Sequence, residues 1–378
     1  MRLSPPAVLF ALIGGAGLAL PLVQFKANRI VPGEGIGLAD LPQGWGTAVL
    51  SGAILAAACW ARWSAALRMA AAVAGLVAVT LSLGVGASQL TPEGNSLARV
   101  SPSSGFWLLL LAFGLMLADA ANRLRPSLSL RWLLLAGAMV LAAGMLTSGL
   151  LDGVSVMREY ASRRDLFLRE AQAHLALAFG SLGLALLAGI PAGIAIFQAP
   201  RWRGPVLGVL NILQTIPSLA LFGIMIPVLG WVAATLPGAA WAGLSGIGTF
   251  PALVALFLYS LLPVVSNTLS GLSGVPAAVR DAALGLGMTR MQVLAQVLVP
   301  LALPVLLAAV RIVLVQNIGL AVIAGLIGGG GFGTFVFQGL NQTAMDLVLL
   351  GALPTIALAL VAGIALDLLV QGARKGAA

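Results

Sequence analysis

The side chains that most often carry out chemistry are scarce in this 378-residue chain. A single cysteine, Cys59, and a single histidine, His174, exclude an intrachain disulfide, a cysteine metal site and a histidine zinc cluster. The two lysines, Lys26 and Lys375, do not complete the G-x-x-x-x-G-K-[ST] sequence with which P-loop proteins bind nucleotides. The residues therefore predict a chain that is not an enzyme, binds no cofactor or metal and has no P-loop of its own.

The composition indicates a membrane environment. Apolar residues make up 60% of the chain and charged residues 8%, and the mean hydropathy is +1.06. A soluble fold of this size could not bury so much apolar surface. The net charge of +9 comes mainly from arginines that stand singly between apolar runs, without the basic patch of a nucleic-acid-binding protein. We therefore expect a polytopic membrane protein with no nucleic-acid partner.

Apolar runs along the chain predict an all-α fold of about ten transmembrane helices, because a helix needs about 20 apolar residues to cross the bilayer core. The first run could instead be a cleaved signal peptide, but no clean A-x-A site follows it, so we expect it to span. The expected spans are Ala7–Val23, Thr47–Ala61, Ala65–Ala87, Gly105–Ala121, Trp132–Leu151, Leu175–Phe197, Pro205–Leu229, Phe250–Leu269, Val305–Ile327 and Leu347–Val370.

The distribution of basic residues predicts the orientation of these spans. Cytoplasmic loops of membrane proteins carry more lysine and arginine than outer loops. With the N-terminus inside, the inner segments carry twelve such residues and the outer segments seven. Both termini are therefore predicted to be cytoplasmic.

The expected spans form two groups. Residues 1–151 hold about five spans as an N-terminal extension, and residues 174–378 hold five more. Residues 152–173 between them are charged and compatible with a helix, which predicts an amphipathic extracytoplasmic connector. No sequence repeat relates the two groups, which weighs against an inverted-repeat secondary carrier.

The longest cytoplasmic connection in the second group, residues 271–304, has the pattern of a bent helical segment. Pro276 is placed to start a helix. Gly285 and Gly287 permit a sharp turn. A second amphipathic piece follows and is expected to end at Pro300. Such a segment is suited to docking into a groove of another protein.

This segment resembles the cytoplasmic signature loop of binding-protein-dependent ABC transporter permeases, which reads E-A-A, three residues, G, nine residues, I-x-L-P. Every interval is kept here, with Asp in place of Glu and Val in place of Ile and Leu. Stretches such as NILQTIPSLALFGIMIPVLG and VRIVLVQNIGLAVIAGLIGGGGFG are similar to the osmoprotectant branch of that family, over about residues 174–372. The N-terminal extension is similar in hydropathy to the YehY type. The matching residues are Asp281, Ala282, Ala283, Gly287, Val297, Val299 and Pro300.

The resemblance implies a C-terminal five-helix MetI-like ABC permease core whose loop docks into a cleft of a cytosolic ATPase. Arg280 and Asp281 would make charge-assisted contacts there. Ala282 and Ala283 would allow close approach, and Gly287 would form the turn. The alanines and the turn would thus shape the contact, and the proline at the end of the motif would begin the next membrane segment.

The resemblance also implies function and partners. The chain would be the permease subunit of an ATP-driven importer that moves glycine betaine, choline or similar quaternary amines across the bacterial cytoplasmic membrane. It would work with two ATPase subunits that use ATP and Mg²⁺, and with a second permease copy or paralogue in the lipid bilayer. A separate extracytoplasmic binding protein would hold the quaternary ammonium in an aromatic cage.

Other interpretations remain open at this stage. The loop could be an interfacial connector without a partner, in which Arg280 only anchors the inner side. The chain could be an ion-coupled carrier or channel, although no acidic residue lies at the middle of a second-group span: Asp367 lies near an inner end and Asp346 at an outer edge. An ABC permease for amino acids is a further alternative, and a membrane-embedded enzyme lacks a metal cluster or nucleophile set.

Polar residues within the second group of spans are candidates for the translocation path, since polar groups avoid hydrocarbon. They could equally hold the helices together by hydrogen bonds. The candidates are Gln214, Thr215, Ser218, Tyr259, Ser260, Ser266, Asn267, Gln316 and Asn317.

Three further features are expected near the membrane surfaces. The run GGGGFG, residues 328–333, predicts a re-entrant turn or gate with close backbone packing, and not a nucleotide loop. His174 is expected at the outer interface, and Arg311 near the inner boundary, where it can snorkel. Several outer aromatic residues are interpreted as interface anchors: Trp231, Trp241, Phe332, Phe335 and Phe337.

Overall fold

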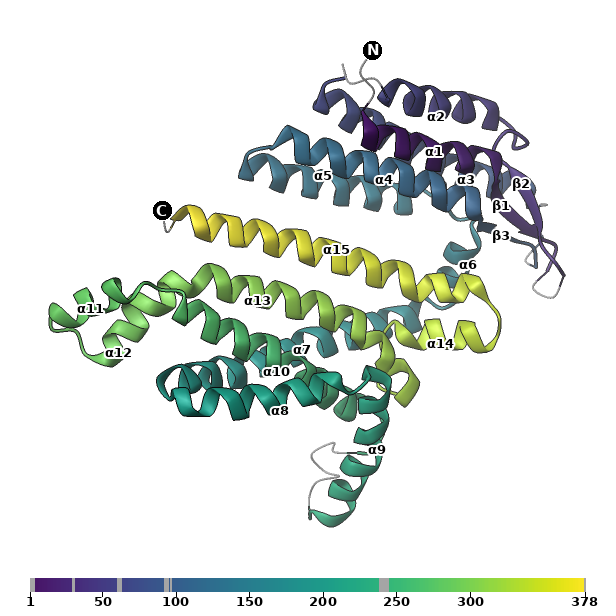
Figure 1. Cartoon of the computed structure of the whole chain (residues 1–378). Coiled ribbons are helices and arrows are strands. Elements are labelled where there is room, and N and C mark those ends of the chain that lie inside the picture. The colour runs from purple at the N-terminus through teal and green to yellow at the C-terminus, as the bar shows by residue number, and fades with distance from the viewer. Residues whose placement is uncertain are drawn as a thin grey trace. The chain divides into compact units, whose positions relative to one another are not determined.

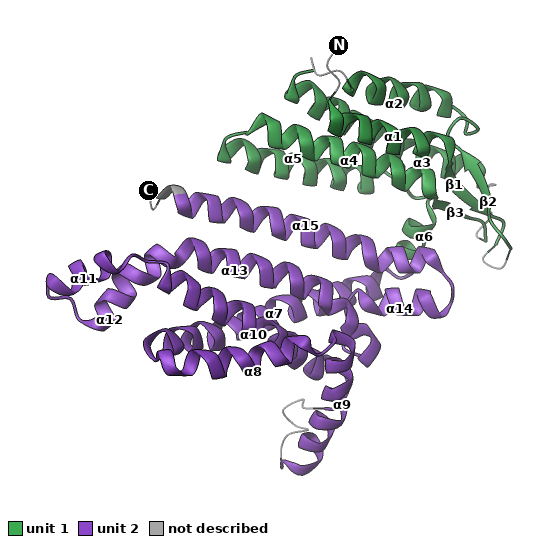
Figure 2. Cartoon of the chain, in the orientation of Figure 1, with its two compact units in different colours: residues 1–162 green, residues 163–378 purple. Residues whose placement is uncertain are grey.

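A computed structural model describes residues 4–28, 31–59, 63–91, 95, 97–237 and 245–376. The chain separates into two compact units, Met1–Ser162 and Arg163–Ala378 (Figure 2). The division falls inside the charged segment 152–173. Each unit is described by itself.

Unit 1 is a group of helices with a small antiparallel sheet at one end (Figure 1). The sheet has the strand order β2-β1-β3, and Phe25 at its centre pairs with Glu34 on one side and Val100 on the other. Its elements are α1 (Pro5–Ala19), β1 (Pro21–Lys26), β2 (Glu34–Gly37), α2 (Gly44–Ala58), α3 (Ala65–Leu90), β3 (Arg99–Pro102), α4 (Ser104–Leu124), α5 (Leu128–Thr147) and α6 (Ser155–Ser162).

The sheet corrects the predicted extent of the first span. That span was expected to continue to Val23, but α1 ends at Ala19 and Leu20 is already extended. The cause is Pro21, because a proline disfavours the helical conformation of the residue before it. The residues that follow, Leu22 and Val23, are fully buried in the strand. An apolar run thus divides between a helix and a strand.

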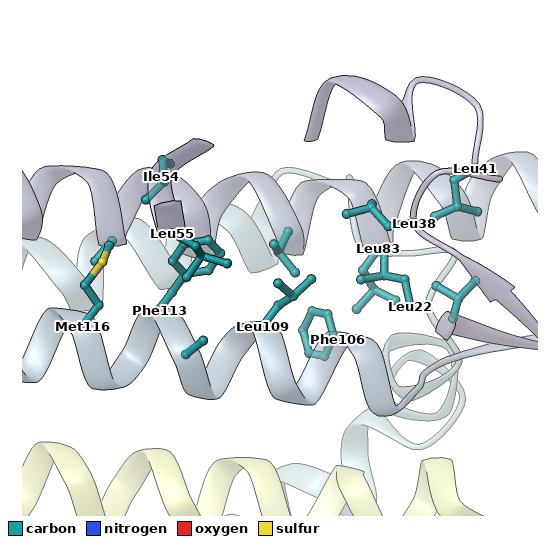
Figure 3. Close-up of a cluster of buried hydrophobic side chains, with 14 of the residues drawn as sticks. Leu22, Leu38, Leu41, Ile54, Leu55, Leu83, Phe106, Leu109, Phe113 and Met116 are labelled. Carbon is teal, nitrogen blue, oxygen red and sulfur yellow. The ribbon is translucent and has the colours of Figure 1, made fainter. Parts of the chain in front are cut away.

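The core of unit 1 is built on one face of α4. Phe106, Leu109, Phe113 and Met116 recur at helical spacing, and all four are buried (Figure 3). Gly75 of α3 permits close packing there, since a Cβ at this position would lie 2.6 Å from a ring carbon of Phe113. In contrast, α5 has no buried residue.

All regular secondary structure in the described residues of unit 2 is helical. Helix α10 packs against α7 and α13, and α13 packs against α15. Its elements are α7 (Arg164–Gln198), the short 3₁₀ helix η1 (Pro200–Trp202), α8 (Arg203–Thr215), α9 (Ser218–Thr235), α10 (Thr249–Ser273), α11 (Ala277–Gly285), α12 (Arg290–Val293), the π-helix η2 (Leu294–Leu298), α13 (Val299–Leu320), the 3₁₀ helix η3 (Ala321–Ile327), α14 (Gly333–Asn341) and α15 (Met345–Gly376).

Two expected segments of unit 2 differ from the prediction. The run Pro205–Leu229 is not one helix, because Pro217 holds Ile216 extended and separates α8 from α9. The charged segment 152–173 is not a separate connector along its whole length. After α6, its last part forms the first turns of the long helix α7, which starts at Arg164.

Eight helices of the described residues are long and apolar enough to cross a membrane. Two more apolar helices, α1 and α2, are shorter, with 15 residues each. The two groups of spans predicted from the sequence correspond to these ten helices, except that the seventh run is divided and only α9 of its two helices has the length to cross.

We predict that Gly75→Val destabilises unit 1 by about 1–3 kcal/mol, the usual cost of overpacking a core. The added side chain would overlap Phe113, which is enclosed on all sides. Urea-dependent or thermal unfolding of the detergent-purified protein measures the change. Gly137→Val on α5 is the matched control, because nothing lies within 4 Å of a Cβ there. Equal effects of the two substitutions would contradict the packing described.

Candidate functional site

The signature segment forms a helical hairpin of α11 and α12. Pro276 is extended and precedes α11, as its position in the sequence predicts. The chain reverses at Gly287, whose φ of +84° is a left-handed conformation that favours glycine. Helix α12 then starts with a capping box: the Thr289 N–H donates to Oε1 of Gln292 at 2.7 Å, and the Gln292 N–H donates to Oγ1 of Thr289 at 3.3 Å.

A small apolar core holds the hairpin to the ends of α10 and α13. Ala283 is buried in this core, so its methyl group contacts the hairpin's own interior. Of the two alanines expected to allow close approach to a partner, only Ala282 is exposed, so only this one offers its methyl group to another protein. The other buried members of the core are Leu272, Val293, Leu294, Leu298 and Ala302.

The outer side of the hairpin exposes large apolar side chains. Leu286 is 86% exposed and Met291 70% exposed, and they flank the turn. Arg280 and Asp281 also lie on the surface, with Nε and Oδ1 3.7 Å apart. An exposed ion pair of this kind adds little to stability, so both charges are available to another protein. The hairpin therefore combines apolar and charged contacts on one short, preorganised element.

The hairpin continues into the longest helical run of unit 2. The sequence predicts that the second amphipathic piece ends at Pro300. This prediction is wrong, because the helix passes through Pro300 into α13. Proline lacks an N–H and crowds the carbonyl four residues earlier, here that of Gln296. The π-helical turn Leu294–Leu298 lies directly before Pro300 and widens the helix at that point. Pro300 thus begins α13 without breaking the run.

Among the path candidates, Asn317 is fully buried and joins three helices. Its Nδ2 donates to Oγ of Ser181 on α7 at 2.8 Å and to Oγ of Ser260 on α10 at 2.9 Å. Both serines also donate to backbone carbonyls of their own helices. These bonds favour the alternative interpretation, in which Asn317 and Ser260 hold the bundle together.

Two further path candidates support the break between α8 and α9. Nε2 of Gln214 donates to the Tyr259 carbonyl at 2.8 Å, and the Tyr259 hydroxyl donates to the Ile216 carbonyl. The two bonds tie α10 to the end of α8 at the point where Pro217 interrupts the helix. The second bond satisfies the Ile216 carbonyl at the break, as helices in a membrane require.

The remaining candidates make local contacts or lie at the margins of the bundle. Thr215 is exposed and donates to the Ile212 carbonyl at 2.7 Å. Nδ2 of Asn267 and the Ser266 hydroxyl donate to the Pro263 carbonyl, at 2.7 Å and 3.4 Å. Half-buried positions are also found for Ser218 and Gln316.

The glycine-rich turn before α14 packs against the start of α7. The Phe332 N–H donates to Nδ1 of His174 at 3.3 Å, and the Thr334 hydroxyl donates to Oε2 of Glu170 at 3.1 Å. Gly331 has φ +85°, and a Cβ there would lie 3.1 Å from His174 Nδ1. The predicted close backbone packing of the turn is thus present, and Glu170 is a member that the sequence did not indicate.

This packing corrects several interface assignments. His174 is fully buried, so it is not an interface residue. Phe332 and Phe335 are also buried, and the Phe167 ring lies against both, with centroids 5.4 and 6.0 Å away. They were expected at the surface because their place in the chain is a loop, but α7 covers them. Phe337 is half-buried on α14 and Trp231 is exposed on α9, whereas Trp241 lies outside the described residues.

Arg311 has a partner that the sequence did not indicate. It donates to Oδ1 of Asp367 on α15, and its location near the inner boundary stays a prediction. No group of three or more His, Cys, Asp or Glu side chains with a metal-binding arrangement occurs among the residues that the structure describes.

Comparison with known protein families gives a match for each of the two parts of the chain. Residues 185–375 match the family described as binding-protein-dependent transport system inner membrane component, and residues 2–157 match the N-terminal domain of the ABC transporter permease YehY. The chain belongs to this permease family. The predicted resemblance is therefore confirmed for both parts of the chain, as is a helical multi-pass permease fold, to which unit 1 adds its small sheet.

Individual relatives match about half of this chain. The osmoprotectant import permease protein OsmW of Salmonella typhimurium is 41% identical over 188 residues, which are 50% of this chain and 82% of that protein. The carnitine transport permease protein OpuCB of Listeria monocytogenes is 38% identical over 193 residues, 51% and 81% of the two chains. A solved chain of the MetNI methionine ABC transporter aligns with a TM-score of 0.48 at 26% identity, over 55% of this chain and 96% of that one.

We predict that Asn317→Ala lowers the stability of the permease by about 1–2 kcal/mol, the scale of two or three hydrogen bonds between membrane helices. The measurement is thermal unfolding in detergent, with Gln316→Ala as the neighbouring control. A variant with unchanged stability and altered transport would show that Asn317 lines the path and does not hold the bundle.

Proposed function

We propose that this permease is the membrane-spanning subunit of an ABC importer for osmoprotectants in the bacterial cytoplasmic membrane. It works with two cytosolic ATPase subunits that use ATP and Mg²⁺, an extracytoplasmic binding protein and a second permease copy or paralogue. Both of its termini are cytoplasmic. The chain contributes the path and the mechanical contact, and ATP hydrolysis takes place on the partner.

The observation that carries this proposal is the exposed hairpin between α10 and α13. The sequence has no P-loop, so ATP-driven movement of this chain requires a partner that prefers one of its conformations. Exposed Leu286 and Met291 would fill apolar pockets of that partner. Arg280 and Asp281 would exchange their weak mutual contact for charge-assisted hydrogen bonds across the interface.

The geometry of the hairpin supports the transmission of force. Gly287 fixes the turn, Ala282 allows close approach, and Ala283 locks α11 onto the hairpin core. Since the helical run continues from Arg290 through Pro300 into α13, a displacement of the hairpin moves α13 with it. An interfacial connector without a partner would have no need of this rigidity.

The nature of the solute follows from the relatives. OsmW is named for osmoprotectants, and similar proteins of Bacillus subtilis are named for glycine betaine, carnitine and choline. These solutes share a quaternary ammonium group. The aromatic cage that holds such a group belongs to the binding protein in this proposal, because Phe332 and Phe335 are occupied in packing against α7.

Uptake into proteoliposomes tests the proposal. The purified transporter, reconstituted with its ATPase and its binding protein, is expected to accumulate radiolabelled glycine betaine or choline only when ATP is supplied to the ATPase side. Uptake driven by an ion gradient without ATPase subunits would establish the ion-coupled carrier instead. Uptake of amino acids but not quaternary amines would overturn the solute class alone.

We predict that Gly287→Val lowers ATP-driven uptake about tenfold or more, because a β-branched residue in the left-handed region costs about 1–3 kcal/mol and would deform the turn. Gly285→Val, two residues earlier, is the control. Its φ is not positive, and nothing lies within 4 Å of a Cβ there. Normal ATP-driven uptake by both variants would show that the turn at Gly287 is not needed for coupling to the ATPase.

A charge reversal addresses the partner contact separately. Asp281→Lys is expected to leave the permease in the membrane, since the side chain is exposed. It should stimulate ATP hydrolysis poorly and slow uptake about tenfold, the effect of losing one charge-assisted hydrogen bond. The corresponding reversal of exposed Asp152, far along the chain in unit 1, should have no effect. Full uptake by Asp281→Lys would exclude this residue from the interface.

A further inference from the structure

Two helices of unit 2 carry a charged pair within their apolar spans. Arg311 of α13 donates to Oδ1 of Asp367 on α15, and Nε2 of Gln371 donates to the other carboxylate oxygen at 2.7 Å. The Arg311 and Asp367 side chains are 38% and 42% exposed. The pair is thus formed at the surface of the unit and not in its interior.

The position of the pair along the helices restricts what can lie against it. Arg311 is about three turns from the start of α13, and Asp367 is about two turns before Arg374, where the apolar span of α15 ends. Charged residues at such positions are costly in hydrocarbon and face a protein interior or water. A half-exposed pair that does not face its own bundle therefore faces either water or a second protein chain, and not hydrocarbon.

The same face of α15 continues away from the pair as an exposed apolar stripe. Its residues recur every three or four positions, so they share one side of the helix with Asp367 and Gln371. This side is apolar except for Asp367 and Gln371 toward the C-terminal end of α15, which suits a path that holds its solute weakly. The exposed stripe consists of Leu353, Ile356, Leu360 and Ile364.

We propose that Arg311 and Asp367 form a subsite of the translocation path that recognises a zwitterion with a quaternary ammonium and a carboxylate. This inference rests on the proposed function. The carboxylate of the solute accepts hydrogen bonds from the Arg311 guanidinium, and its ammonium lies against the Asp367 carboxylate. Gln371 holds Asp367 in place by its bond to Oδ2.

Charge conservation is the physical basis of this recognition. An ion pair within an apolar span is costly to break when one partner is left without an opposite charge. A zwitterion such as glycine betaine gives each residue a new opposite charge when the Arg311–Asp367 pair opens. Its carboxylate pairs with Arg311, and its ammonium pairs with Asp367. Choline, which has no carboxylate, leaves Arg311 uncompensated. The pair therefore favours the zwitterion over the simple cation of similar size.

The test compares two solutes in reconstituted transporter with saturating, loaded binding protein. Arg311→Gln is expected to lower glycine betaine turnover about tenfold, as for loss of one hydrogen bond to a charged group, and to change choline turnover less than about twofold. Asp367→Asn should slow both solutes. Arg374→Gln is the matched control, since it removes an exposed arginine of α15 outside the pair.

The double variant Arg311→Gln/Asp367→Asn separates recognition from packing. A neutral amide pair can still connect α13 to α15, so assembly and thermal stability should stay near wild type while the preference for glycine betaine is lost. The single and double variants could instead slow the transport of both solutes equally, or only in proportion to lost stability. The pair would then only connect α13 to α15, and the inference would fail. A wild-type transporter that moves neither solute with ATP would instead overturn the proposed function, and the subsite with it.

Discussion

A hydrocarbon environment requires every backbone N–H and C=O group to be satisfied within the protein, and unit 2 meets this requirement with one uninterrupted helical run. From Arg290, through the π turn and α13, to Ile327, the chain remains helical. The second helix of the exposed hairpin, α12, is the start of this run, and the glycine-rich turn lies directly after it. Movement in such an element is restricted to rotation and translation of a rod, so force applied to the hairpin has a defined route into the membrane.

The contacts of the rod determine what moves with it. Asn317 ties it to α7 and α10 through two buried serines, and Arg311 ties it to α15. After Ile327 the chain turns at glycines that pack on His174, so α7 contacts both the middle of the rod and the turn that follows it. The half-exposed Arg311–Asp367 pair differs because part of its polar surface remains open.

Features set by neighbouring residues could be predicted from the sequence, and features set by distant contacts could not. The hairpin followed from Pro276 and Gly287, and the spans followed from hydropathy. The π turn was missed because its cause is the clash of Pro300 with a carbonyl one turn earlier, which is not visible as an apolar pattern. The buried states of His174 and Phe332 depend on α7 meeting a turn that is far away in the sequence. The strand after α1 was hidden in an apolar run, although Pro21 is a signal that could have located its start.

Cysteine cross-linking at the tip of the hairpin tests the central claim most directly. A Cys59→Ser background leaves the chain without cysteine, so Leu286→Cys supplies a unique reactive thiol at the most exposed apolar position of the hairpin. In the assembled transporter this thiol is predicted to cross-link to a nucleotide-hydrolysing subunit, with a yield that changes when ATP is bound. A thiol that stays open to a membrane-impermeant maleimide from the cytosolic side, with no such cross-link and with ATP-driven uptake intact, would contradict the account.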